Sequence, residues 1–323
     1  MWPRPCSEYI GRPSGAGNRL ALEVYVCHDP FVTDTRRLPV LDELTVVLPQ
    51  RHRARVLGIA PGSNEALVML VQDFARSTNP KMELEPVWRL HRYERDPESG
   101  ALHPSEVARF THPTRGLGAV LMAHDSDGIY LMFDGRLLRV DPDRRSVEGV
   151  CQLQLADVGS QDQPQVRGMA IRPGMLAVTV ETSPDDLSLH IVPLPTGVPQ
   201  HFAIPASQGE QLAWGPDATL YLLDLGELSA WRDGRSVGSV DLTPRVKDWF
   251  RQPAELLAVD EKGHLYAGAG DTLIHLSPEL DVLETLQLPG PSHGLTALGP
   301  GMGMLSRRID EVSATLVLQT FAP

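Results

Sequence analysis

A strand–turn–strand unit recurs along the chain and constrains its fold more than any other feature. It reads Leu-Ala-Trp-Gly-Pro-Asp-Ala-Thr-Leu-Tyr at 212–221 and Leu-Ala-Val-Asp-Glu-Lys-Gly-His-Leu-Tyr at 257–266. A third copy, at 121–130, reads Leu-Met-Ala-His-Asp-Ser-Asp-Gly-Ile-Tyr. Asp and Gly tolerate the positive φ of a tight hairpin. Each copy therefore predicts two antiparallel strands joined by a polar turn.

Two further apolar segments follow the first and third of these hairpins in chain order, which gives four strands per unit. Four antiparallel strands are the anatomy of a propeller blade. Marker residues at the ends of the predicted first strands lie 39 to 63 residues apart, and most steps are close to a typical blade length: Ala60, Ala123, Ile171, Trp214, Val259 and Leu298. We predict an all-β protein, a single β-propeller of six four-stranded blades. Seven blades are the alternative.

The last unit shows only three strands, so the ring needs a closing strand from elsewhere. We expect Leu44–Leu48 to pair with Thr315–Thr320, because an open ring would expose two sheet edges. Residues 1–41 are then an N-terminal extension with a strand at Leu20–Cys27, and residues 42–323 form the propeller. An insertion rich in proline and charge is predicted at about 76–105.

One segment outside the strand pattern predicts a short helical turn. Thr243–Gln252 contains a threonine followed by proline, which suits an N-cap at Thr243 and a first helical position at Pro244.

The blade strings resemble a known superfamily. Gly215–Asp224, which reads Gly-Pro-Asp-Ala-Thr-Leu-Tyr-Leu-Leu-Asp, and Leu138–Asp143 are similar to the hairpin strings of six-bladed NHL and gluconolactonase (SMP-30)-like propellers. The resemblance implies a six-bladed fold. Metal-dependent lactonases of that group hold a cation near the axis through Glu, Asn and Asp side chains. Asn79 is the last asparagine in this sequence, so the Asn ligand has no counterpart.

Charge and cysteine content narrow the partners and the compartment. The net charge is −12, from 41 acidic and 29 basic residues, which disfavours binding to a phosphate backbone. No apolar run reaches the roughly 18 residues of a membrane span. The three cysteines are an odd number and show no Cys-x-x-Cys spacing, which argues against a disulfide framework or a zinc site. With no signal-peptide core, we expect a cytoplasmic protein, and the arginine-rich composition suggests a bacterial one.

Three motifs invite a chemical interpretation, and each has a structural one. Gly234–Gly238 matches the Gly-x-Ser-x-Gly nucleophile pattern but lies between predicted strands, not at a strand-to-helix elbow. Asp125–Gly128 lacks the later ligands of a calcium loop. His264 and His275 are expected on blade surfaces or turns. We predict no catalytic constellation, no metal site and no cofactor.

The strongest binding hypothesis is positional. One ionisable residue precedes each predicted innermost strand, where propeller loops open around the axis: Arg55, Arg115, Arg167, Glu210, Glu255 and His293. Arginine forks suit carboxylates or phosphates. A channel entrance lined by both positive and negative side chains suits a zwitterionic molecule or a peptide that carries both charges. We predict that these residues bind the ligand or partner, and that arginines and glutamates pair across the channel when it is empty.

Three functions compete. The leading hypothesis is a non-catalytic scaffold or recognition subunit that binds a protein partner, with the predicted insertion as a candidate contact. The alternatives are a metal-dependent lactonase or hydrolase that uses carboxylates such as Glu210 and Glu255, and a sensor of small anionic molecules. The sequence specifies neither the partner nor the oligomeric state.

Overall fold

Short strands follow one another along the chain and fold back as antiparallel meanders. The computed structural model describes residues 36–37, 40–46, 55–62, 66–76, 84–111, 120–133, 135–153, 165–183, 186–195, 200–204, 211–252, 255–288, 292–298, 301–309 and 314–321. All of them belong to one compact unit, Thr33–Pro323, and the predicted strand at Leu20–Cys27 lies outside them. The described residues form twenty-five strands and two three-residue 3-10 helices, so the all-β prediction is confirmed. Neither helix is long enough to cross a membrane.

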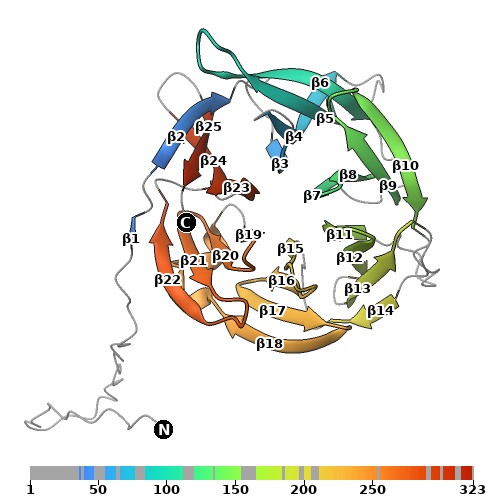
Figure 1. The fold of residues 1–323 in the computed structure, drawn as a ribbon, viewed down its shortest axis with the longest axis vertical. Coiled ribbons are helices and arrows are strands. Elements are labelled where there is room, and N and C mark those ends of the chain that lie inside the picture. Colours follow the sequence, from blue (N-terminus) through green and yellow to red (C-terminus); the bar gives the residue numbers. More distant parts are fainter. Residues whose placement is uncertain are drawn as a thin grey trace, which may run out of the picture. The chain divides into compact units, whose positions relative to one another are not determined.

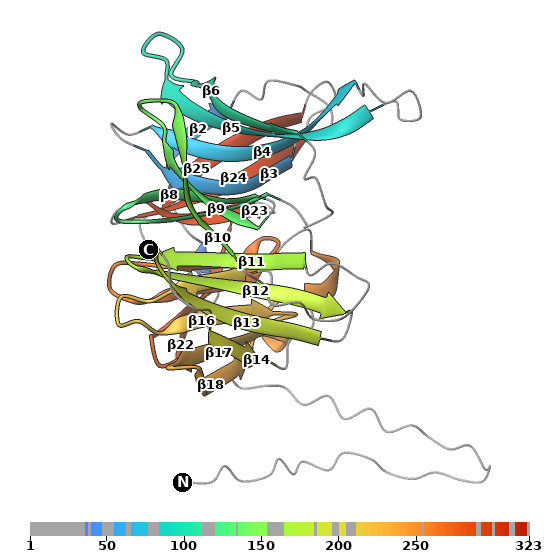
Figure 2. The ribbon, with the colours of Figure 1, turned by 90° about the vertical axis from the view of Figure 1, so that its right-hand side faces the viewer.

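Three of the predicted units form separate four-stranded sheets. The first contains β7 (Leu121–Asp125), β8 (Gly128–Phe133), β9 (Arg136–Asp141) and β10 (Ser146–Gln152). The second contains β11 (Gln165–Arg172), β12 (Met175–Ser183), β13 (Asp186–Pro193) and β14 (Gln200–Ala203). The third contains β15 (Gln211–Trp214), β16 (Leu220–Asp224), β17 (Glu227–Arg232) and β18 (Arg235–Asp241). Figure 2 shows β11, β12 and β13 side by side in the second sheet.

A fourth sheet gains a fifth strand from the start of the described chain. It contains β19 (Glu255–Val259), β20 (Leu265–Ala269), β21 (Thr272–Leu276), β22 (Val282–Gln287) and β1 (Arg36–Arg37). The short strand β1 pairs in parallel with the outer strand β22. Arg36 also holds Glu284 of β22 through two contacts, Nε to Oε2 at 3.0 Å and Nη2 to Oε1 at 3.1 Å. Both contacts tie β1 to the edge of this sheet.

The first and last units share one eight-stranded sheet. One half contains β3 (Arg55–Pro61), β4 (Leu67–Arg76), β5 (Leu84–Arg95) and β6 (Leu102–Thr111). The other half contains β23 (Ser292–Leu298), β24 (Gly301–Ile309), β25 (Ala314–Phe321) and β2 (Val40–Val46). A parallel bridge between Val46 and Leu102 joins the halves. The prediction of six separate blades is therefore wrong: the described strands form five sheets, because two outermost strands meet.

The predicted closure by an N-terminal strand is confirmed. β2 runs antiparallel to β25, with Leu44 opposite Leu318 and Val46 opposite Leu316. The innermost strands then contact one another in ring order, from β3 through β7, β11, β15, β19 and β23 back to β3 (Figure 1).

The described part of the predicted insertion at 76–105 is largely β-structure. It includes β5 and the start of β6, the two outer strands of the first half-sheet. Two prolines of this segment are placed where strands tolerate them. Pro104 lies on β6, an outermost strand of its half-sheet, and Pro97 lies in the turn between β5 and β6.

The predicted helical turn is present but begins one residue earlier. The two 3-10 helices span Thr243–Arg245 and Trp249–Arg251, and the first is capped by Leu242, not by Thr243. Thr243 instead bonds backward: its backbone N–H and its hydroxyl donate to Asp241 Oδ1 at 2.9 and 2.6 Å. The threonine side chain is thereby engaged outside the helix.

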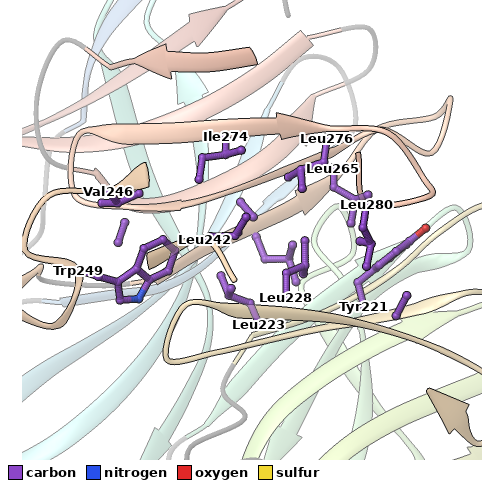
Figure 3. Close-up of a cluster of buried hydrophobic side chains, with 14 residues drawn as sticks. Tyr221, Leu223, Leu228, Leu242, Val246, Trp249, Leu265, Ile274, Leu276 and Leu280 are labelled. Atoms are coloured by element: carbon purple, nitrogen blue, oxygen red, sulfur yellow. The ribbon is translucent and has the colours of Figure 1, made fainter. Parts of the chain in front are cut away.

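Hydrophobic clusters between neighbouring sheets hold the blades together. One cluster lies between the β15–β18 and β19–β22 sheets, where Leu223 and Leu228 pack near Leu265 and Ile274 (Figure 3). Trp249 lies at one end of this cluster and Tyr221 at the other end. Similar clusters fill the spaces between other neighbouring sheets. Burial of these faces supplies the main driving force for folding.

The two turn motifs take their structural interpretations. Gly234 has a φ of 73° at the β17–β18 turn, and a Cβ there would lie 2.0 Å from Phe202 Cε1 of the neighbouring sheet. The Gly-x-Ser-x-Gly pattern is therefore a packed hairpin. Asp125 Oδ1 accepts hydrogen bonds from the backbone N–H groups of Asp127 and Gly128 at 2.7 and 3.0 Å, which makes this segment a β7–β8 turn.

Ring closure predicts an asymmetric effect of N-terminal deletion. Removing residues 1–47 deletes β1 and β2 and leaves β25 as an unpaired edge, so the melting temperature should fall by about 10 °C or more, or the protein should aggregate. Removing residues 1–32 keeps both strands and should change the melting temperature by less than about 2 °C. Circular dichroism melts compare the three proteins. If the 1–47 deletion melts like the full chain, β2 does not close the ring.

Candidate functional site

The innermost strands surround the axis of the propeller with open edges. Each innermost strand lies at the edge of its sheet and has a single hydrogen-bonded neighbour among the described strands. These edge strands are β3, β7, β11, β15, β19 and β23. Figure 1 shows the other edge of each facing the centre of the ring. An edge strand leaves backbone N–H and C=O groups without a ladder partner. The axis is therefore lined by donors and acceptors of the main chain.

An axial cavity of about 490 Å³ lies between these strands. Its volume falls within the usual range for small-molecule sites. Apolar residues such as Leu57 and Met122 form much of its wall. Its polar and aromatic side chains come from five of the six innermost strands: His124, Arg167, Gln211, Trp214, Glu255 and Thr296.

Glu255 is the most firmly positioned of these side chains. It is the first residue of β19 and is partly buried. Its Oε1 atom accepts two hydrogen bonds, from the indole Nε1–H of Trp249 at 2.6 Å and from the backbone N–H of Gly226 at 2.9 Å. Both donors belong to turns of the preceding sheet. Gly226 has a φ of 87°, and a Cβ at this position would clash with Thr243 and crowd Trp249, so the approach requires glycine.

The surroundings of Glu255 oppose its ionisation. Burial raises the pKa of this carboxyl above the usual glutamate value, and the negative charge of Asp224 raises it further. The hydrogen bonds from Trp249, Gly226 and the backbone of Leu225 lower the pKa, but they do not offset burial. All the donors to this carboxylate are neutral. Within the described part of the chain, no cation balances the charge of this cavity-lining carboxylate.

Arg167 differs from Glu255, because its charge is balanced by a carboxylate of its own sheet. Its Nε forms an ion pair with Glu181 of β12. About 38% of the arginine side chain and 20% of the glutamate side chain remain exposed. Such a pair contributes about 0–1 kcal/mol to stability.

Two further groups lie toward the ends of β7 and β15. His124 Nε2 lies 3.1 Å from Thr296 Oγ1 of β23, and burial lowers the pKa of this histidine, so it is neutral at neutral pH. The guanidinium of Arg172 lies over the ring of Trp214, 4.7 Å from the ring centroid. The buried Nε1 of Trp214 has no hydrogen-bond partner among the described residues. This indole N–H remains able to donate to an added acceptor.

The ring of ionisable residues predicted from the sequence is only partly visible. Arg167 and Glu255 both line the cavity, but each is bonded to a neighbour on its own side and not across the channel. Arg115 and Glu210 lie outside the described residues, and the side chains of Arg55 and His293 do as well. Their role stays a prediction.

A metal centre of the kind implied by the family resemblance does not fit the described side chains. Calcium requires six to eight oxygen ligands. No group of three His, Cys, Asp or Glu side chains in the described part of the chain is placed to hold an ion. His275 is stacked on Tyr266 at 4.7 Å and lies 3.2 Å from Glu284 Oε1, which is a local packing arrangement.

Several cavity residues were not singled out as ligand contacts in the sequence. Gln211, His124 and Thr296 occupy ordinary strand positions. Trp249, which bonds Glu255 but does not itself line the cavity, lies in the turn segment before β19. The available signal for Trp249 was its position six residues before Glu255 in a segment already predicted to turn. Its contact with the carboxylate depends on the Gly226 turn, which lies 29 residues from Glu255 in the chain.

Comparison with known proteins identifies the fold. No protein-family profile and no curated protein matches the sequence. Among solved structures, regucalcin, a calcium-binding protein from Agrobacterium tumefaciens, is 14% identical with a TM-score of 0.55, over 90% of this chain and 98% of that chain. A putative gluconolactonase is 15% identical with a TM-score of 0.50, over 88% of this chain and 94% of that chain.

This chain shares the propeller fold of these regucalcin and gluconolactonase-like proteins. The fold is not confined to them. Raptor from Chaetomium thermophilum matches with 7% identity and a TM-score of 0.50, over 90% of this chain and 29% of that chain. At such identities the likeness establishes architecture alone.

The raised pKa of Glu255 predicts a pH-dependent effect of its neutral analogue. A raised pKa means that this group favours folding most at acid pH, and that this contribution is lost as pH rises through the raised value. Glu255→Gln stays neutral and keeps an acceptor for Trp249 and Gly226. It should melt about 1–3 °C above the wild type at pH 7.5 and together with it near pH 4.

Thermal melts across this pH range, with the exposed Glu227→Gln as a matched control, measure the effect. The control should follow the wild type at each pH. A lower melting temperature for Glu255→Gln at pH 7.5 would show that the carboxylate is stabilised in its ionised form.

Proposed function

We propose that this protein binds a small polyhydroxylated organic molecule in the axial cavity. The observation that carries the proposal is the cavity itself, about 490 Å³ enclosed by the open edges of the innermost strands. The proposal departs from the protein scaffold favoured by the sequence. It is closest to the sequence alternatives of a small-molecule sensor or a lactonase.

Hydroxyl groups match the chemistry of this wall. Each hydroxyl both donates and accepts a hydrogen bond, and an exposed strand edge alternates N–H donors with C=O acceptors. The side chain of Gln211 offers the same dual capacity. The apolar stretches contributed by Leu57 and Met122 suit the carbon skeleton of such a molecule. A six-carbon polyol is well below the cavity volume.

Lactone hydrolysis is the second candidate, supported by the likeness to a putative gluconolactonase. A partly buried carboxyl with a raised pKa, such as Glu255, suits proton transfer to or from an attacking water. A pH-stat assay with gluconolactone measures this activity directly. Loss of turnover in Glu255→Gln, with retained binding of the open-chain acid, would support it.

Protein recognition stays a prediction, and one surface feature favours it. Phe250 is 72% exposed, although it follows the buried Trp249 directly in the chain. Exposed aromatic side chains are enriched at protein interfaces. Among the described residues, Phe250 is therefore the first position to replace if a protein partner is captured.

If the axial cavity is the binding site, polyols should bind to the protein, and a bulky side chain placed in the cavity should weaken their binding. Isothermal titration calorimetry with sorbitol, gluconate and glucamine should give at least one dissociation constant of about 1 mM or lower. Leu57 lines the cavity and is 39% exposed, so Leu57→Trp should occupy this space and weaken binding by about tenfold or more.

The matched control is Val237→Trp, at a position that is 57% exposed. Val237 lies on β18, the outermost strand of its sheet, at the opposite end from the innermost strand β15. This variant should bind like the wild type. Absence of binding for all three probes, or equal binding by Leu57→Trp, would refute the axial site.

A further inference from the structure

We propose that Glu255 is a subsite for a protonated amine, so that the natural ligand of the cavity is a hydroxylated amine and not a sugar acid. The inference rests on the proposed axial site and specifies the chemical class of its ligand. It follows from a comparison of the ionisable side chains of the cavity wall, some of which have a partner of opposite charge while one has none among the described residues.

Glu255 lines the cavity and has no cationic partner among the described residues. Its hydrogen-bond donors, Trp249 Nε1–H and Gly226 N–H, are neutral. The charged group that acts on it from β16 is Asp224, which has the same sign. Lys247 and Arg251, in the adjoining turn segment, are exposed and form no ion pair with it in the described structure. A partly buried carboxylate in this state gains from a cation supplied by a ligand.

The other ionisable groups of the described cavity wall do not compete for this role. Arg167 is paired with Glu181, so the two charges cancel within one sheet. His124 is held neutral by burial and lies against Thr296. Summed over these described side chains, the wall has an excess negative charge at Glu255. An ammonium group is attracted to such a wall, and a carboxylate is repelled.

Trp249 acts as a positioning residue for this subsite. Its indole is 4% exposed and packs in the cluster between the β15–β18 and β19–β22 sheets (Figure 3). From this fixed position its N–H holds Oε1 at 2.6 Å. Oε1 accepts from Trp249 and Gly226, and the backbone N–H of Leu225 also acts on this carboxyl, so an ammonium group would bind at Oε2. The ligand therefore meets a carboxylate of fixed orientation.

Three probes with the same six-carbon polyol chain separate charge from shape. Glucamine carries a terminal ammonium, sorbitol a terminal hydroxyl and gluconate a terminal carboxylate. At pH 7.5 we expect glucamine to bind about tenfold or more tightly than sorbitol, and gluconate to bind most weakly. The preference for glucamine should decline as pH is lowered and Glu255 takes up a proton.

Variants assign the preference to Glu255 and to its orientation. Glu255→Gln should reduce the glucamine-to-sorbitol affinity ratio to below about twofold. Trp249→Phe should reduce the ratio partially, and this ratio is a readout that simple destabilisation would not alter. Glu227→Gln, an exposed carboxylate on β17, should keep the full ratio.

The outcomes distinguish the two proposals. Equal binding of sorbitol and glucamine would overturn the amine subsite and leave the axial site standing, whereas no binding of any probe would overturn both. Displacement of glucamine by calcium chloride, lost in Glu255→Gln, would reassign the carboxylate to a metal cation and also overturn the inference. Tighter binding of gluconate than of glucamine would likewise overturn the inference.

Discussion

The antiparallel pairing of β2 with β25 is the interaction on which the rest of the structure depends. It places a strand from the beginning of the described chain beside the last strand, with Leu44 opposite Leu318. Only a closed ring brings β23 against β3 and gives every inner strand a neighbour on both sides. The axial cavity exists because this ring is closed. Closure thus links a stability requirement, the protection of sheet edges, to the formation of a binding site.

The proposed function depends on side chains and open strand edges at the axis. Among its described residues, the cavity combines a hydrogen-bonding wall with one carboxylate whose charge no cation balances. Trp249 and Gly226 come from the preceding sheet, so the geometry of Glu255 depends on how two sheets pack. The same cluster that stabilises this packing therefore orients the proposed recognition group. Stability and the proposed ligand selectivity are thus coupled at Trp249.

Local chemistry explains what could be predicted from the sequence. Turn residues such as Asp125 and Asp217 bond to their own backbone within a few positions, so the hairpins and the all-β class were visible without a structure. The sequence could not show that Val46 meets Leu102, because this contact joins outermost strands of different units. It also misplaced the partners of Arg167 and Glu255. Ion pairing depends on cross-strand register and on neighbouring sheets, which single residue positions do not specify.

The ionisation of Glu255 is the most direct test of this account. A carbon-13 NMR titration of its carboxyl group reports the pKa in the free protein and in the presence of saturating glucamine or sorbitol. The account predicts a free value above the usual one for glutamate, a marked decrease with glucamine and little change with sorbitol. A carboxyl that titrates at the ordinary value, or that does not respond to glucamine, would contradict it.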